Sequence, residues 1–140
     1  MKRVGDHPSP GPPPRVLLVM EAQWPRANVR AALREVGYDA VGARSLAEAL
    51  SVRAAEPGRG PVELILVDQS ALRDPRSDAL LARLLASHAE PPAVLLAPST
   101  VETHAGAWRR VLRRPVSIEE IVAAVEALLP RPRSARRPLE

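Results

Sequence analysis

The chain has 140 residues, a length that fits one domain with tails rather than two ordinary domains. Hydrophobic residues make up 46% but aromatic residues only 2%, too few rings for a stacking surface that binds single-stranded nucleic acid. Cysteine is absent, which excludes disulfides, thiolate zinc sites and cysteine nucleophiles. No apolar run approaches the roughly 20 residues of a membrane span, so we expect a cytoplasmic protein with no membrane partner.

The net charge of +4 belongs to the two ends of the chain. Residues 1–14 and 130–140 are basic and rich in proline, whereas residues 15–129 contain 14 arginines and 14 acidic residues. We therefore expect a disordered Pro-rich tail over 1–14, a neutral folded domain over 15–129 and a disordered basic tail over 130–140. This distribution argues against a folded nucleic-acid-binding face, and binding through the arginine tail stays as an alternative.

Apolar runs alternate with segments of helical spacing along the folded part. Residues 16–20 and 62–67 are continuous apolar runs, typical of strands buried on both faces. Ser45 with Glu48, and Ser117 with Glu120, have the spacing of helix capping boxes. The pattern predicts strands at 16–20, 38–43, 62–67, 93–97 and around 111–112, and helices at 25–37, 45–55, 77–87, about 101–107 and 117–129.

Strand and helix thus alternate five times, which predicts an α/β fold of the flavodoxin-like type: a five-stranded parallel sheet with helices on both faces. In such folds the functional site lies beyond the carboxyl ends of the strands. The residues at those ends are Met20 and Glu21, Asp68, Ala97, and the run Arg113-Arg114-Pro115.

Four stretches resemble, in their order and spacing, the response-regulator receiver domain of two-component signalling: RVLLVME, VGYDAVGARSLAEAL, VELILVD and GAWRRVLRRPVSIEEIVAAVEALL. The likeness covers about residues 15–129. It implies that Asp68 is the phosphoacceptor, whose carboxylate oxygen attacks a phosphoryl group carried on a histidine of a partner sensor kinase and forms an acyl phosphate.

The resemblance also implies helper residues, and several have been replaced. The acidic pair that holds Mg²⁺ in receivers aligns with Met20 and Glu21, and the phosphoryl-binding hydroxyl aligns with Ala97, although Ser99 and Thr100 lie nearby in the sequence. The aromatic switch position aligns with Val111. We therefore expect no cofactor, or weak Mg²⁺ binding through Glu21, Asp68 and the Ser70 carbonyl.

The lysine position of the family is taken by Arg114, followed by Pro115, and the X-Pro bond at this place is usually cis in receivers. Arginine keeps the positive charge but presents a planar fork instead of a compact ammonium. Arg114 could therefore approach a phosphoryl group or form a bidentate ion pair with Asp68.

Trp108 and the arginines around it form a candidate interface (Arg109, Arg110 and Arg113). In receivers the face made by the fourth helix, fifth strand and fifth helix contacts partners or a second copy, and a tryptophan among arginines suits such a contact. The alternative is that Trp108 packs under the short helix and the arginines are solvated. The histidines His7, His88 and His104 are isolated in the sequence, which favours structural or solvated roles over metal binding.

The sequence therefore predicts a stand-alone, degenerate receiver: a non-enzymatic protein-interaction module of phosphorelay signalling, with impaired Mg²⁺-dependent phosphorylation at Asp68. One alternative is a competent phosphoacceptor that uses Glu21 and Asp68 for Mg²⁺. Another is a nucleotide- or flavin-binding protein of the same fold. Residues 21–25 contain no glycine to shape a phosphate-binding turn, which argues against it.

Overall fold

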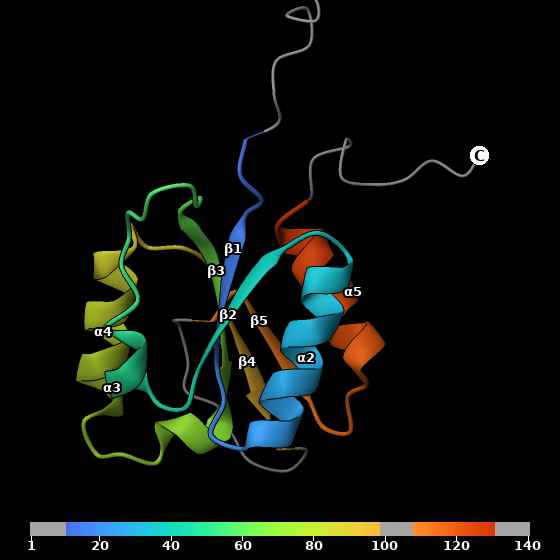
Figure 1. Cartoon of the computed structure of the whole chain (residues 1–140). Helices are drawn as coiled ribbons and strands as arrows, with labels where there is room; N and C mark the ends of the chain where they lie inside the picture. The colour runs from blue at the N-terminus through green and yellow to red at the C-terminus, as the bar shows by residue number, and fades with distance from the viewer. Residues whose placement is uncertain (1–10, 99–107, 131–140) are drawn as a thin grey trace, which may run out of the picture.

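The computed structural model describes residues 11–98 and 108–130, and its strands form a single parallel sheet (Figure 1). The strand order is β2-β1-β3-β4-β5, which confirms the predicted fold class. The strands are β1 (Arg15–Val19), β2 (Asp39–Ala43), β3 (Val62–Asp68), β4 (Ala93–Ala97) and β5 (Arg110–Arg113). Every residue of β1 and β4 is buried. This agrees with their continuous apolar runs, which are typical of strands covered on both faces.

Helices cover both faces of the sheet. Figure 1 shows α2 (Gln23–Glu35) and α5 (Ile118–Leu128) on one side, and α3 (Leu46–Ala49) and α4 (Ser77–Ser87) on the other. Each layer has its own apolar core: α2 and α5 contribute to one cluster, and α3 and α4 to the second. The β-sheet therefore separates two hydrophobic cores.

Local sequence signals explain where the helices begin and end. Pro25 lies in the first turn of α2, where its missing N–H would have no helical partner. Gly37 follows the helix with a φ of 108°, in the left-handed region that favours glycine. At α5 the predicted capping box is confirmed, because Ser117 accepts from the Glu120 N–H and the Glu120 side chain accepts from the Ser117 N–H.

The predicted helix over residues 45–55 is wrong in length. The helix is confined to α3, and the backbone beyond residue 50 is not helical. There the carbonyls of Arg53 and Ala54 accept hydrogen bonds from the Arg15 guanidinium at 2.8 and 3.2 Å. The capping box at its start is also only half formed. Ser45 accepts from the Glu48 N–H, but the Glu48 carboxylate accepts from the Arg44 N–H instead of closing back on Ser45.

Some of the sequence predictions lie outside the described residues. These are the short helix around 101–107 and most of the two tails, residues 1–10 and 131–140. At the described end of the first tail, the Pro14 carbonyl accepts a hydrogen bond from the Asp39 N–H at 2.9 Å. Over 11–98 and 108–130, none of the helices has the length and apolar character needed to traverse a bilayer.

Candidate functional site

Asp68 ends β3 beside β1, where the order of the strands reverses. The chain moves from β1 outward to β2 on one side and to β3 on the other, so the carboxyl ends of β1 and β3 frame the crevice in which ligands of such folds bind. The Asp68 side chain is only 9% exposed and caps the 3-10 turn η1 (Gln69–Leu72). Its Oδ2 accepts a hydrogen bond from the Ser70 N–H at 3.0 Å.

Arg114 approaches Asp68 from the end of β5. Its backbone N–H donates to the Ala97 carbonyl at 2.9 Å, which extends the pairing of β4 with β5 by one residue. Its Nη2 donates to Asp68 Oδ1, so the structure contains an ion pair between these two side chains. The bidentate pair that Arg114 could form is not seen here: Arg114 contacts Oδ1, and Oδ2 accepts from the Ser70 N–H. The Arg114-Pro115 bond is cis, as expected.

The ionisation of Asp68 reflects this environment. Burial by itself raises the pKa of the carboxyl group, but the hydrogen bonds from Ser70 and Arg114, together with the charge of Arg114, favour the ionised form. The net result is a pKa below the ordinary value for aspartate. Asp68 is therefore a carboxylate at neutral pH with both of its oxygens engaged.

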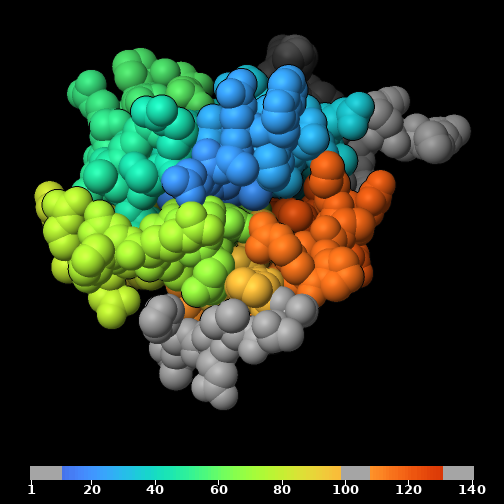
Figure 2. All heavy atoms as spheres, turned by 90° about the horizontal axis from the view of Figure 1, so that it is seen from below, coloured from blue at the N-terminus to red at the C-terminus, as the bar shows by residue number. Residues whose placement is uncertain are grey.

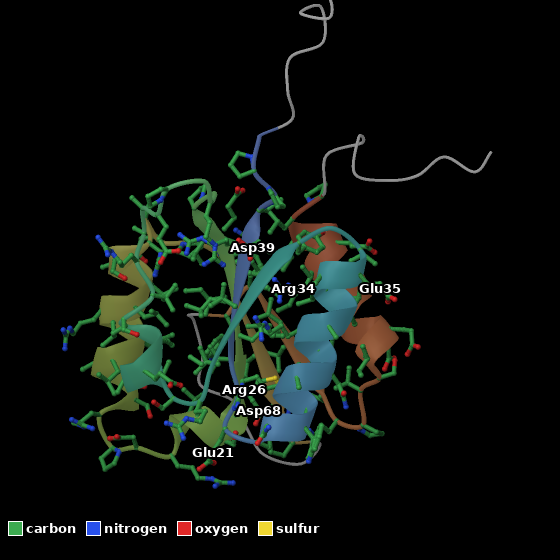
Figure 3. All side chains as sticks on the ribbon, in the orientation of Figure 1. Glu21, Arg26, Arg34, Glu35, Asp39 and Asp68 are labelled. Carbon is green, nitrogen blue, oxygen red and sulfur yellow. The ribbon has the colours of Figure 1, made fainter. Side chains whose placement is uncertain are left out.

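Glu21 lies at the same end of the sheet but is engaged elsewhere. Figure 3 shows Glu21, Arg26 and Asp68 at this end, away from Asp39. The Glu21 carboxylate pairs with Arg73 at 3.4 Å, and both side chains are mostly exposed. Arg26 donates to the carbonyls of Met20 and Glu21 at 2.8 and 3.2 Å. Arginine side chains therefore contact the residues that follow β1 as well as Asp68.

The other aligned positions are apolar and packed. Met20 is 3% exposed and belongs to the core beside α2 and α5, as its apolar character predicted. Ala97 is fully buried at the end of β4, and Val111 is half-buried in β5. Ser99 and Thr100, the hydroxyl residues next along the chain, lie outside the described residues.

These residues do not fit a Mg²⁺ site of the receiver type. Within the described residues no group of three or more acidic, histidine or cysteine side chains could hold a metal ion. Met20 supplies a buried thioether where an acid is needed, the Arg114 guanidinium contacts Asp68, and Glu21 is paired with Arg73. Magnesium demands near-ideal octahedral oxygen ligation, which this set does not provide.

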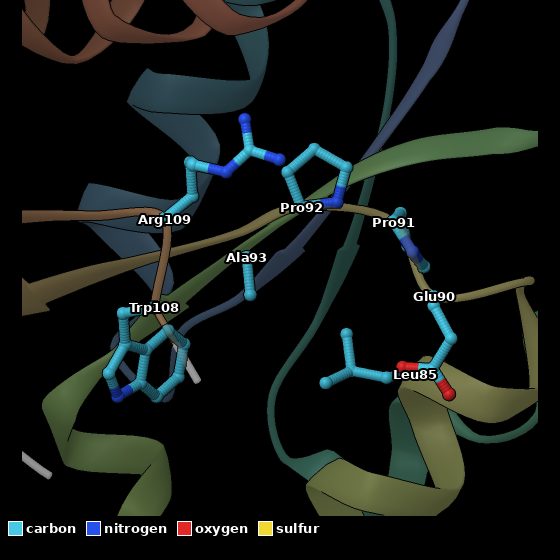
Figure 4. Close-up of a pocket in the computed structure, with 7 residues that line it drawn as sticks. All are labelled: Leu85, Glu90, Pro91, Pro92, Ala93, Trp108 and Arg109. Carbon is cyan, nitrogen blue, oxygen red and sulfur yellow. The ribbon is translucent and has the colours of Figure 1, made fainter. Parts of the chain in front are cut away.

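Trp108 and the neighbouring arginines have different surroundings in the structure. Trp108 is partly buried and packs against the core cluster of α3 and α4. Its Nε1 is buried without a hydrogen-bond partner among the described residues. Figure 4 shows it beside Arg109 in a cavity of about 480 Å³ that Leu85, Glu90, Pro91, Pro92 and Ala93 complete. Arg109, Arg110 and Arg113 are exposed. Trp108 is thus a packing residue at the margin of an arginine-rich strand.

Sequence reasoning missed Arg26, Arg73 and Arg15, and it left open whether His88 is structural or solvated. Arg26 and Arg73 reach the residues after β1 from a helix and from an irregular segment, and no spacing rule connects them to Glu21. Arg15 and His88 are buried at the opposite end of the sheet, where Arg15 is completely inaccessible and His88 is 6% exposed. A charged residue before an apolar run gives no sign of burial, so these contacts appear only in three dimensions.

A comparison with solved structures identifies the fold. One similar structure is the receiver domain of an HD-domain-containing protein from Pseudomonas fluorescens Pf-5, with 22% identity, coverage of 84% of this chain and 94% of that chain, and a TM-score of 0.66. The non-phosphorylated HemR receiver domain from Leptospira biflexa has 18% identity, coverage of 91% of this chain and 99% of that chain, and a TM-score of 0.63. A CheY-like receiver domain protein from Methanospirillum hungatei JF-1 has 14% identity, coverage of 82% of this chain and 92% of that chain, and a TM-score of 0.65. This chain has the receiver-domain fold.

The receiver likeness is one of structure. No family model matches the sequence, and a search of the curated proteins found no match. At these identities the structural matches establish the fold, while the chemistry must be argued from the residues at the strand ends.

Proposed function

We propose that this chain is a degenerate receiver domain, a non-enzymatic signalling module that works by contacting other proteins and whose Asp68 is a poor phosphoacceptor. The observation that carries the proposal is the ion pair of Asp68 with Arg114 at the end of a receiver-type sheet. The side chain that the family uses for chemistry is here tied to a residue of its own chain.

The chemistry explains why such a site accepts a phosphoryl group poorly. One Asp68 oxygen would have to attack the phosphorus in line with the leaving group, and the hydrogen bond that each oxygen accepts lowers its nucleophilicity. The approaching phosphoryl group is itself negative, and its charge needs a metal ion and positioned donors. Ala97 offers no hydroxyl, and Met20 offers no carboxylate for Mg²⁺.

Arg114 also contributes to the proposal in a second way. The exposed part of its guanidinium can attract a phosphoryl group, but each contact it makes with that group competes with its contact to Asp68. A lysine ammonium would be smaller and would leave one face of the carboxylate open. We therefore expect Asp68 to be phosphorylated faster in Arg114→Lys than in the wild-type chain.

The test is incubation with acetyl phosphate and Mg²⁺, followed by intact-mass measurement over time. We expect no phosphoryl increment, or one of low occupancy, in the wild-type chain and a higher occupancy in Arg114→Lys. Arg113→Lys is the matched control and is expected to behave as wild type. A wild-type chain that gains one phosphoryl group at high occupancy, and loses that ability in Asp68→Ala, would establish the alternative of a competent receiver that uses Glu21 and Asp68 for Mg²⁺.

The partner in this proposal is a sensor histidine kinase or another signalling protein, or a second copy of the chain. The face formed by β5 and α5 supports it, because β5 is an edge strand that exposes Arg110 and Arg113. Sedimentation velocity tests the homodimer: Arg110→Glu with Arg113→Glu should remove any self-association, whereas Arg83→Glu on α4 should not. Equal association in all three proteins excludes this face.

A further inference from the structure

An apolar cleft of about 340 Å³ lies between α2 and the segment that leads from β5 into α5. Its floor includes Met20 and Leu96, which are buried. Figure 2 looks onto this end of the molecule and shows α2 beside the C-terminal segment that carries α5. The volume is within the range of sites that hold small organic molecules.

The two walls of the cleft come from different parts of the chain. Trp24 and Asn28 project from α2, and Val116 and Ile118 lie on the opposite side. Trp24 is 73% exposed, the one large hydrophobic side chain of the described residues that is left in water to this extent. An aromatic ring at the rim of a concave apolar surface is the arrangement that a ligand with an apolar body would cover.

Arg114 is the sole charged residue among those that line the cleft. A guanidinium has five N–H donors, and within the described residues the Arg114 side chain gives one of them to Asp68. Its side chain is 43% exposed, so further donors remain open to an incoming group. The cleft therefore combines an apolar surface with one guanidinium, whose charge is partly offset by Asp68 just outside the lining.

We propose that this cleft binds a small organic anion with an apolar body and a single carboxylate or sulfonate head, the head pairing with Arg114 and the body lying against Trp24. The sign of the head follows from the lone arginine, and the size of the body follows from the volume of the cleft. The proposal concerns non-covalent binding only, and a phosphoryl group on Asp68 would compete with the anion for Arg114.

The test uses two fluorescent probes that share one apolar body. 1-Anilinonaphthalene-8-sulfonate carries the anionic head, and N-phenyl-1-naphthylamine lacks it. We expect the sulfonate to bind saturably with one site per chain and more tightly than the neutral probe. Arg114→Gln should weaken binding of the sulfonate at least tenfold and leave binding of the neutral probe within twofold, since only the charge-assisted contact is removed.

Two further variants locate the site. Arg113→Gln removes an exposed arginine next in sequence and should bind the sulfonate as wild type does. Asn28→Trp replaces an exposed residue on the cleft wall with a large ring, so it should block both probes without disturbing the core, and circular dichroism checks its fold. Wild-type affinity in either Arg114→Gln or Asn28→Trp, or sulfonate binding that does not saturate, overturns the proposal.

Discussion

An arginine side chain contacts the sheet at each of its two ends, and the two differ in how far water reaches them. At the amino end of β1, Arg15 is completely buried and donates to the backbone carbonyls of Gly60 at 2.5 Å and Arg53 at 2.8 Å. At the carboxyl end, Arg114 is 43% exposed and pairs with the side chain of Asp68. Within the described residues, the first arginine is held by several backbone carbonyls and lies 3.7 Å from the Glu56 carboxylate, and the second is held by the Asp68 carboxylate.

The difference separates a structural role from a functional one. Because Arg15 satisfies carbonyls of the segment between α3 and β3, that segment needs no helix to hold its place. Within the described residues the Arg114 side chain donates to no backbone carbonyl, and its partner is Asp68, the residue that the resemblance to receivers implies as the phosphoacceptor. An exposed arginine with one partner can exchange that partner for an incoming anion, whereas a buried arginine with several cannot.

The largest effect is expected at the buried end. Arg15→Met leaves the carbonyls of Gly60, Arg53 and Ala54 without their donor inside the protein, so we expect the free energy of unfolding to fall by about 3 kcal/mol. Urea denaturation measures it, with the exposed Arg109→Met as control, which should change stability by no more than about 0.5 kcal/mol. A loss below about 1 kcal/mol for Arg15→Met would mean that the segment does not depend on this side chain.

Arg15 also shows where prediction from sequence stops. The strands were recognisable because central strands of a parallel sheet must be apolar along their whole length, and α5 was recognisable from its capping box and apolar stripe. The helix after Ser45 was predicted too long because its pattern is locally sound. Only the tertiary contact with Arg15 shows why residues 53 and 54 leave the helix.

A second, smaller effect belongs to His88, which lies at the same end. Burial, and then the charge of Arg15, hold the pKa of His88 below its ordinary value. The unfolded chain therefore binds a proton more readily than the folded one. The free energy of unfolding should be unaffected above the unfolded pKa of about 6.5, and fall by up to about 1.4 kcal/mol per pH unit as the pH drops from there toward the folded pKa.

His88→Leu removes this titration, and with it two buried ring nitrogens that have no hydrogen-bond partner among the described residues. The unfolding free energy of this variant should change less between pH 7 and pH 5 than that of the wild type, as measured by urea denaturation at several pH values. Parallel curves for His88→Leu and wild type would contradict this assignment.

The smallest effect on stability is expected at the exposed end. Arg114→Gln breaks a pair in which one partner is well solvated, so the loss at pH 7 should be at most about 1 kcal/mol. The pKa of Asp68 is lowered in the folded protein, so the contribution of the pair is present above the unfolded pKa of about 3.9 and is lost as the pH falls through the folded pKa. A loss as large as that of Arg15→Met would remove the distinction between the two ends.

The candidate site was partly predictable for the same reason as the sheet. In a parallel α/β fold the carboxyl ends of the strands lie on one edge, so chain order placed Asp68 and residues 113–115 there, and the resemblance to receivers singled out Arg114. The geometry of the pair could not, because it depends on the Ser70 N–H taking the second carboxylate oxygen. The pairing of Glu21 with Arg73 depends on an irregular segment that carries no periodic signal.

The most direct test of the account is the pH titration of the Asp68 carboxyl carbon by ¹³C NMR, assigned by its absence in Asp68→Asn, in the wild type and in Arg114→Gln. The account predicts a pKa below about 3.9 in the wild type and a clearly higher one in Arg114→Gln, where burial opposes ionisation with one donor fewer. The same pKa in both proteins would contradict it, because Arg114 would then not hold the carboxylate.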